Sequence, residues 1–187
     1  KGLPLDQFDK ITVILHKRHE EEYKASNGVR DCMKLEFGDD VLNKLDFYII
    51  DETNSQAETI YKYLLTKKKS EEIVIKDTDN YFHINALSFM NSVAVYDLHK
   101  MKKVNAANKS YVNYSGHTLD SIVEKKIISE KFCCGLYVFE DSKKFVRAYK
   151  KTKPEYISQI IEYLLDDGED FWVQDVEDYL DWGTIDE

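Results

Sequence analysis

The chain has 187 residues, and its 26 Lys and Arg residues against 35 Asp and Glu residues give a formal net charge of −9. This acidic balance argues against a nucleic-acid backbone as the main partner, because binding such a backbone requires a basic face. It does not exclude nucleotides, since a bound metal can screen carboxylates from phosphates. The hydrophobic share of 43% and the charged share of 33% are typical of a soluble globular protein, and the length predicts one domain over residues 1–187.

The sequence shows no signal for membrane insertion or secretion. No apolar run approaches the length of a membrane span, and no signal peptide is visible. The three cysteines, Cys32, Cys133 and Cys134, are odd in number and lack zinc-site spacing, so we expect a reducing, cytoplasmic setting. The first residue is Lys1 rather than an initiator Met, which indicates a cut or processed form. The sequence leaves homo-oligomer formation open.

The first part of the chain alternates apolar runs with amphipathic segments. Buried strands are predicted at residues 11–15, 46–50 and 72–76, and helices at 20–37 and 56–65. The first helix is expected to break near Gly28. This β-α-β-α-β order predicts an α/β fold with a mixed, mostly parallel sheet flanked by helices.

The second part is richer in strands, and no repeat or low-complexity linker interrupts it. Pro154 suits the first turn of a helix, and the pair Asp167-Gly168 suits its end. The predicted strands are 92–96, 111–114, 119–123 and 133–139, the predicted helices are 141–149 and 155–165, and short extended pieces are predicted at 171–173 and 179–182.

Residues 123–139 read VEKKIISEKFCCGLYVF, in which a Glu-Lys pair precedes a β-rich run containing Gly135. Glu124 and Lys125 are neighbours, so on a regular strand their side chains would point to opposite faces. They can meet one ligand only where the strand ends or bulges.

Two carboxylates follow the strand predicted at 72–76. Asp77 and Asp79 are two residues apart, which puts them on one side if the strand continues. Ligands of open α/β sheets bind at the carboxyl ends of strands, and Mg²⁺ commonly takes one or two carboxylates together with substrate phosphates. The alternative is a turn rich in Asp and Asn that ends the strand.

Three further segments attract attention. Residues 179–184 read YLDWGT, in which Asp181 precedes a Trp and a glycine turn; the alternative is a surface turn in an acidic tail. Residues 50–59 read IDETNSQAET, where Thr53, Asn54 or Ser55 is expected to cap the next helix. Residues 109–112 read KSYV, which also suits a surface strand.

Taken in order, these segments resemble the sugar-phosphate nucleotidyltransferase family, and in particular its branch in capsule and surface-polysaccharide gene clusters. The resemblance covers the chain from about Ile11 to its end. It implies a glycosyltransferase-A-like (Rossmann-like) nucleotidyltransferase fold. It also implies transfer of a nucleotidyl group from a nucleoside triphosphate to a sugar phosphate, or to a similar phosphorylated alcohol, with release of pyrophosphate.

The resemblance also implies residue roles. Asp79 and Asp181 would hold Mg²⁺, with Asp77 as a further or alternative ligand. Glu124 would bind sugar hydroxyls and Lys125 the phosphate, and the backbone around Gly135 would lie along the sugar. In the family, a Thr-x-Gly-x-Ala-x-Thr pattern supports the nucleotide base; Thr53 matches it, whereas Ser55 replaces the glycine. Neither the base nor the sugar is identified.

The family opens with a glycine-rich G-x-G-x-R loop that cradles the triphosphate, and none of the seven glycines forms such a cluster. We therefore expect a truncation at the N-terminus and little or no catalysis by the chain as given. Two alternatives stay open. One is a non-catalytic homologue that binds a sugar nucleotide or serves as an interaction domain. The other is an unrelated acidic domain, in which Asp79 and Asp181 would lie far apart.

Overall fold

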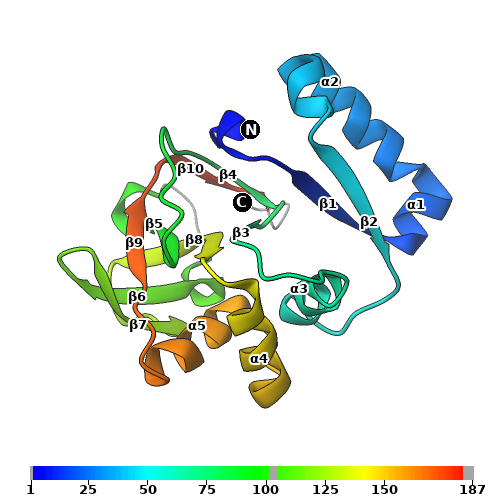
Figure 1. Cartoon of the computed structure of the whole chain (residues 1–187). Helices are drawn as coiled ribbons and strands as arrows, with labels where there is room; N and C mark the ends of the chain where they lie inside the picture. The colour runs from blue at the N-terminus through cyan, green and yellow to red at the C-terminus, as the bar shows by residue number, and fades with distance from the viewer. Residues whose placement is uncertain (1, 102–104, 183–187) are drawn as a thin grey trace. The chain divides into compact units, whose positions relative to one another are not determined.

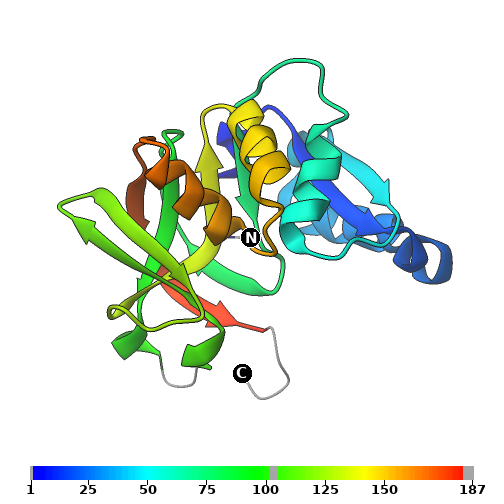
Figure 2. The same ribbon diagram turned by 90° about the horizontal axis from the view of Figure 1, so that it is seen from below.

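A computed structural model describes residues 2–101 and 105–182 of the chain (Figures 1 and 2). The residues divide into two compact units, Pro4–Asn54 and a larger one formed by Lys1–Leu3 with Ser55–Glu187. The assignment of residues 1–187 to one domain stays a prediction. No helix in the described ranges is long and apolar enough to cross a membrane.

The smaller unit is a two-stranded parallel sheet with its connecting helices. It contains a short 3₁₀ helix (Leu5–Gln7), β1 (Ile11–His16), α1 (Lys17–Tyr23), α2 (Ala25–Leu42) and β2 (Leu45–Ile50). Strand β1 pairs with β2 from Ile11 opposite Leu45 to His16 opposite Ile50. The helical segment is divided at Lys24, whose φ of 51° is left-handed, and α2 is kinked at Gly38, whose φ is 76°; the break predicted near Gly28 is not found.

The larger unit is built on a six-stranded sheet in the order β3-β8-β5-β9-β7-β6. Strand β6 also pairs with β8, so the sheet curls into a small barrel-like form. A second sheet pairs β4 with β10. The elements of this unit are α3 (Gln56–Leu64), β3 (Ile73–Lys76), β4 (Asn80–His83), β5 (Ser92–Asp97), 3₁₀ helices at Leu98–Lys100 and Ala106–Asn108, β6 (Ser110–Ser115), β7 (Thr118–Glu124), β8 (Lys131–Phe139), α4 (Ser142–Thr152), α5 (Ile157–Asp166), β9 (Trp172–Asp175) and β10 (Glu177–Asp181).

The α/β class is confirmed, but the expectation of a mostly parallel sheet is not met. Among the described residues, only β1–β2 and β5–β9 pair in parallel, and the other pairings are antiparallel. The reason is topological. An alternation of strands and helices predicts parallel neighbours only if each strand pairs with the next strand in the chain. Here β3 pairs with β8, which follows it much later in the chain and runs antiparallel to it.

Helices α3, α4 and α5 lie next to one another and cover part of the barrel-like sheet (Figures 1 and 2). Their apolar faces join the strands in one core, in which Phe139 of β8 packs edge-to-face on Phe145 of α4 and on Phe171, with ring centroids 5.2 and 5.8 Å apart. All three rings are at most 1% exposed. This core fixes β8, along which the pocket described below is built.

We expect Phe145→Ala to lower the free energy of unfolding by about 3–5 kcal/mol, because it removes a fully buried ring and leaves a cavity. Urea denaturation followed by circular dichroism measures the loss. The matched control is Leu65→Ala just after α3, whose side chain is 52% exposed and should cost about 1 kcal/mol or less. Equal losses in the two variants would contradict this assignment of the core.

Candidate functional site

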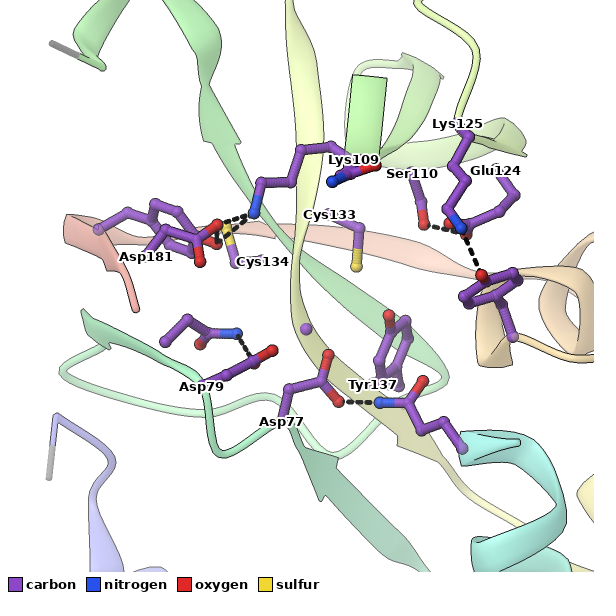
Figure 3. Close-up of a pocket in the computed structure, with 16 residues that line it drawn as sticks. Asp77, Asp79, Lys109, Ser110, Glu124, Lys125, Cys133, Cys134, Tyr137 and Asp181 are labelled. Atoms are coloured by element: carbon purple, nitrogen blue, oxygen red, sulfur yellow. Dashed lines mark hydrogen bonds and ion pairs between the residues drawn. The ribbon is translucent and has the colours of Figure 1, made fainter. Parts of the chain in front are cut away.

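A polar pocket of the larger unit brings together most of the residues predicted to form a site (Figure 3). It is lined by elements that are far apart in sequence: the β3–β4 turn, the start of β6, the end of β7, the middle of β8 and the end of β10. Of the predicted residues, those lining it are Asp77, Asp79, Glu124, Lys125, Gly135 and Asp181.

The two remaining predicted residues are placed elsewhere. Ser55 caps α3, and its hydroxyl accepts a hydrogen bond from the Glu58 backbone N–H at 3.1 Å, so of the three candidate caps it is the one used. Thr53 belongs to the smaller unit. Neither lines the pocket, and their assignment to a nucleotide base stays a prediction.

A bulge in β8 shapes the centre of the pocket. Val93 of β5 pairs with Tyr137 and Val95 pairs with Cys133, so three residues of β8 lie opposite one residue of β5. Gly135 is the middle residue of the three and has a φ of 76°, a left-handed conformation that glycine adopts without steric cost. Its carbonyl accepts a hydrogen bond from the Asp77 backbone N–H at 2.8 Å.

The turn between β3 and β4 lies against this bulge. Lys76, half-buried at the end of β3, donates to the backbone carbonyls of Asp77 at 2.5 Å and Asn80 at 3.1 Å, and its ammonium lies 4.7 Å from the centre of the Phe82 ring. The Asp77 carboxylate also accepts a hydrogen bond from the Gln56 side-chain amide. The turn is therefore held from both sides, and its carboxylates line the pocket.

Asp181 is the last residue of β10, and Asp79 directly precedes β4, the strand that pairs with β10. Asp181 ends β10 opposite Asn80 of β4, and the Trp182 backbone N–H donates to the Asp79 carbonyl at 2.8 Å. Their side chains line the same pocket (Figure 3). The large separation expected for an unrelated acidic domain is therefore not observed.

Glu124 and Lys125 lie where β7 ends. Glu124 is the last strand residue and Lys125 has a left-handed φ of 54°, so the alternation of side chains stops there and both line the pocket. The Glu124 carboxylate is fixed through Oε2, which accepts hydrogen bonds from the hydroxyls of Ser110, at 2.5 Å, and Ser158. The Lys125 ammonium bonds to the Tyr156 hydroxyl, and that bond raises its pKa.

The pocket has more carboxylates than ammonium groups. Burial raises the pKa of Asp77 to about 7, and the nearby charge of Asp79 acts in the same direction. A pocket with this surplus would repel a phosphate unless a cation were also bound. The charged groups in its lining are the carboxylates of Asp77, Asp79, Glu124 and Asp181 and the ammonium groups of Lys109 and Lys125.

The donor set suits a hard cation completed by its substrate. Among residues 2–101 and 105–182, no cluster of three or more His, Cys, Asp or Glu side chains is placed to enclose a metal ion. Mg²⁺ does not require such a cage, since it is commonly bound by one or two carboxylates together with phosphate oxygens and water. Asp79 and Asp181 both line the pocket, and their assignment as cation ligands stays a prediction.

Several pocket residues were not predicted. Lys109 forms an ion pair with Asp181, and Tyr179 lies within hydrogen-bonding distance of both. Tyr156 and Gln56 hold Lys125 and Asp77. The sequence holds only a partial signal for Lys109 and Tyr179 as pocket residues. Lys109 directly precedes the Ser-Tyr pair of β6, and Tyr179 lies two residues before Asp181 on the same strand. Neither position by itself indicates which side chain is its partner.

Comparisons with known proteins identify the fold. No protein-family model matches the chain, and no curated protein matches it. Among solved structures, a nucleoside-diphosphate-sugar pyrophosphorylase from Vibrio cholerae superposes with a TM-score of 0.71 at 19% identity, covering 94% of this chain and 77% of that chain. A UDP-glucose pyrophosphorylase complexed with UDP-glucose gives 0.68 at 12% identity, covering 95% and 77%.

An inositol-1-phosphate CTP transferase from T. maritima superposes with a TM-score of 0.66 at 13% identity, covering 92% of this chain and 69% of that chain. At these identities the similarity shows the fold alone. The chain has the fold of sugar-phosphate nucleotidyltransferases.

We expect Gly135→Ala to destabilise the protein more than Gly168→Ala. Both glycines have positive φ, at 76° and 89°, so both variants incur backbone strain of about 1 kcal/mol. A Cβ at residue 135 would also clash with the Asp77 carboxylate and come within 2.9 Å of the Asn80 amide nitrogen, whereas residue 168 has open space. Thermal denaturation of the two variants measures the difference, and equal shifts would contradict the close approach of Asp77 to β8.

Stability without divalent cations should fall as pH rises from about 4 to 7. The Asp77 pKa of about 7 in the folded state lies above its ordinary value of 3.8, so the folded state holds more protons than the unfolded state in this window. The linked loss in the free energy of unfolding is up to about 4 kcal/mol. Urea denaturation in EDTA at several pH values measures it.

Asp77→Asn should flatten this pH profile and make the variant relatively more stable above pH 7. The matched control is Asp166→Asn at the exposed end of α5, which should leave the profile unchanged. A wild-type profile that rises between pH 4 and 7 and is unaffected by Asp77→Asn would show that Asp77 is ionised throughout.

Proposed function

We propose that the protein is a nucleotidyltransferase that uses Mg²⁺ to transfer a nucleotidyl group from a nucleoside triphosphate to a sugar phosphate, or to a similar phosphorylated alcohol, releasing pyrophosphate. The observation that carries this proposal is that one pocket is lined both by Glu124 and Lys125, at the end of β7, and by Asp79 and Asp181. We propose the synthesis of polysaccharide precursors in the cytoplasm as its setting. The free cysteines Cys32, Cys133 and Cys134 suit a reducing compartment.

The acceptor would bind at the end of β7. The Lys125 ammonium would pair with its phosphate, and Tyr156 beside it holds that ammonium in the pocket. Glu124 would accept hydrogen bonds from hydroxyls of the sugar or alcohol, because two hydroxyl donors already orient its carboxylate. The β8 backbone at Gly135 would lie along the acceptor, since the bulge brings main chain to the pocket surface.

The cation would bind at the end of β10. Asp79 and Asp181 would supply carboxylate oxygens, with Asp77 beside them as a further or alternative ligand. The cation, when bound, supplies charge neutralisation for the phosphates. Thr53 and Ser55 would support the nucleotide base, as the resemblance to the family implies.

The reaction is an in-line displacement at phosphorus. An oxygen of the acceptor phosphate forms a bond to the α-phosphorus, the bond from that phosphorus to the bridging oxygen of the β-phosphate breaks, and pyrophosphate leaves with the electron pair. Catalysis of this kind is mainly positioning and charge neutralisation. Lys125 neutralises and orients the attacking phosphate, and Glu124 fixes the rest of the acceptor, so the protein acts chiefly on the geometry of attack.

The solved neighbours support this substrate class. Three of them are named as a nucleoside-diphosphate-sugar pyrophosphorylase, a UDP-glucose pyrophosphorylase complexed with UDP-glucose, and an inositol-1-phosphate CTP transferase. The pocket described above would accommodate either kind of acceptor, because Lys125 addresses the phosphate that both share.

A second candidate is a non-catalytic homologue that binds a sugar nucleotide or serves as an interaction domain in the same pathway. One sequence feature favours it: Ser55 stands where the family has a glycine. The two candidates differ in one measurement. The enzyme and a homologue that binds a sugar nucleotide both bind ligand in the pocket, whereas only the enzyme releases pyrophosphate from a nucleoside triphosphate and an acceptor phosphate.

We expect sugar 1-phosphates with Mg²⁺ to raise the melting temperature of the wild-type protein, because a ligand that binds only the native state stabilises it. Lys125→Met should lower the acceptor affinity by at least tenfold. The matched control is Lys126→Met, which removes the same charge from the adjacent exposed residue outside the pocket lining and should change the affinity less than threefold. A screen of sugar and inositol phosphates by thermal shift, followed by calorimetry, measures these effects.

Equal losses in Lys125→Met and Lys126→Met would exclude Lys125 as the phosphate-binding group. A parallel assay of pyrophosphate release separates the two candidates. Binding with release supports the enzyme, and binding without release supports the non-catalytic homologue. Absence of binding by every phosphorylated alcohol and nucleotide tested, in a protein shown to be folded, would refute the enzyme and the homologue that binds a sugar nucleotide, and would favour the interaction domain.

A further inference from the structure

Lys109 lies where the proposed cation is expected to act. It immediately precedes β6, and its ammonium forms an ion pair with Oδ2 of Asp181 at the end of β10. The two side chains are 13% and 5% exposed, so this pair is largely shielded from water. Figure 3 shows the Lys109 side chain reaching across the pocket to that carboxylate.

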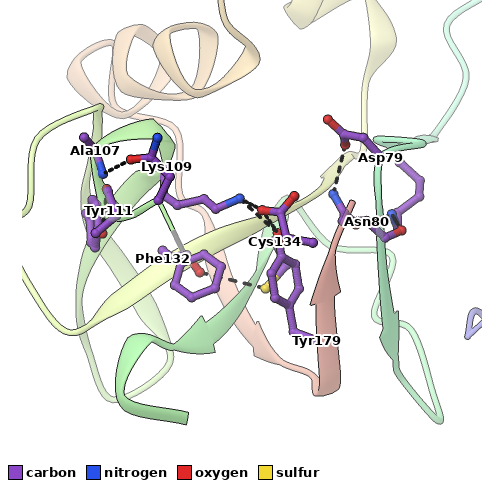
Figure 4. A network of polar contacts seen from close by, with 12 residues as sticks. Asp79, Asn80, Ala107, Lys109, Tyr111, Phe132, Cys134 and Tyr179 are labelled. Atoms are coloured by element: carbon purple, nitrogen blue, oxygen red, sulfur yellow. Dashed lines mark hydrogen bonds and ion pairs between the residues drawn. The ribbon is translucent and has the colours of Figure 1, made fainter. Parts of the chain in front are cut away.

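The surroundings hold this pair in place. The Lys109 ammonium donates to the Tyr179 hydroxyl at 3.3 Å, and that hydroxyl donates to Oδ2 of Asp181 at 3.2 Å, so the three groups form a closed triangle. The ammonium also lies 5.7 Å from the centre of the Tyr179 ring and 6.0 Å from that of Phe132. Figure 4 shows the Lys109 side chain extending past Phe132 toward Tyr179.

This arrangement conflicts with simple metal binding. A divalent cation on Asp181 would lie next to an ammonium that already contacts the same carboxylate, and two like charges at such a distance repel strongly in a partly desolvated pocket. The ammonium therefore has to leave Asp181 when the cation arrives. The side chain has a flexible four-carbon stem, so this movement requires no change of backbone.

The backbone of Lys109 limits where its side chain can go. Its carbonyl accepts a hydrogen bond from the Lys125 backbone N–H at 3.0 Å, so its main chain is fixed beside the residue that would hold the acceptor phosphate. Both lysines line the same pocket. An ammonium released from Asp181 therefore stays within reach of a phosphate bound by Lys125.

We propose that Lys109 is an internal counter-ion that exchanges with the divalent cation on Asp181 and then pairs with the phosphate of the acceptor. Without cation it neutralises a buried carboxylate; with cation it adds a second ammonium to the acceptor side of the pocket. The cation and the acceptor phosphate thereby promote each other's binding. This inference rests on the proposed function, because it requires a cation at Asp181.

Lys109→Met tests the exchange, since Met keeps most of the apolar stem and removes the charge. Calorimetric titration with Mn²⁺, in the absence of phosphorylated ligands, should show at least tenfold tighter binding to this variant than to the wild type. The matched control is Lys125→Met, which removes a pocket ammonium that bonds to Tyr156 rather than to Asp181. Its effect on Mn²⁺ affinity should be less than threefold.

A second titration tests the role toward phosphate. In saturating Mn²⁺, Lys109→Met should bind a sugar 1-phosphate at least fivefold more weakly than the wild type, whereas in EDTA the two proteins should differ less than twofold. A merely structural role of Lys109 would weaken both titrations together. Circular dichroism establishes that each variant is folded.

Wild-type protein provides an independent measurement if Lys109→Met does not fold. With ¹³C-labelled lysine, the Cε–Hε signal of Lys109, assigned by its loss in Lys109→Arg, should shift when Mg²⁺ is added. Mn²⁺ binding of equal strength in wild type and Lys109→Met, or a Lys109 signal that Mg²⁺ leaves unchanged while it binds, would overturn the exchange. Absence of cation binding by both proteins would instead overturn the proposed metal site.

Discussion

The hydrogen bond between the Asp77 backbone and the carbonyl of Gly135 is the constraint on which the pocket depends. It joins the β3–β4 turn to β8, and β8 is also the strand that contacts β3, β5 and β6 and carries Phe139 into the core. The bulge at Gly135 makes room for this turn. Only a left-handed residue without a side chain lets the Asp77 carboxylate lie so close to the β8 backbone. The packed core thus holds the Asp77 carboxylate in a buried position, although burial disfavours its charged form.

The two ends of the pocket differ in how far their charged side chains are neutralised. At the end of β7, Glu124 and Lys125 have partners that satisfy and orient them, namely the hydroxyls of Ser110, Ser158 and Tyr156. At the other end, the carboxylates of Asp77, Asp79 and Asp181 line the pocket together with the ammonium of Lys109, and burial, aided by the charge of Asp79, raises the pKa of Asp77. The first part is ready for a ligand as it stands. The second part would be completed by added positive charge, which is the physical reason for the coupling of cation and phosphate that we propose.

The sequence predicts local structure well and long-range partners poorly. The strand end at Glu124 follows from the rule that adjacent residues face opposite ways, and the cap of α3 follows from the preference of Ser55 for that position. Strand β4 is missed because it directly follows Asp77 to Asp79, a segment with the composition of a turn. Its pairing with β10 depends on residues about a hundred positions later in the chain. The strand order of the sheet is not predicted for the same reason, because it depends on pairing between segments far apart in the chain. Lys109 is missed because an isolated lysine beside a strand gives no sign of its carboxylate partner, which only the fold brings near.

The pairing of β4 with β10 makes the two parts of the pocket unequal in local stability. This sheet has only two strands, whereas Glu124 and Gly135 belong to the six-stranded sheet that carries the core. Two-stranded sheets are marginal by themselves, and Tyr179, buried edge-on against Phe132, is a main attachment of β10 to the rest of the unit. Opening of this ribbon would therefore remove Asp181 from the pocket while the barrel-like sheet stays intact. A cation shared by Asp79 and Asp181 would join the turn before β4 to the end of β10, so the ion that neutralises the phosphates would also suppress this local unfolding.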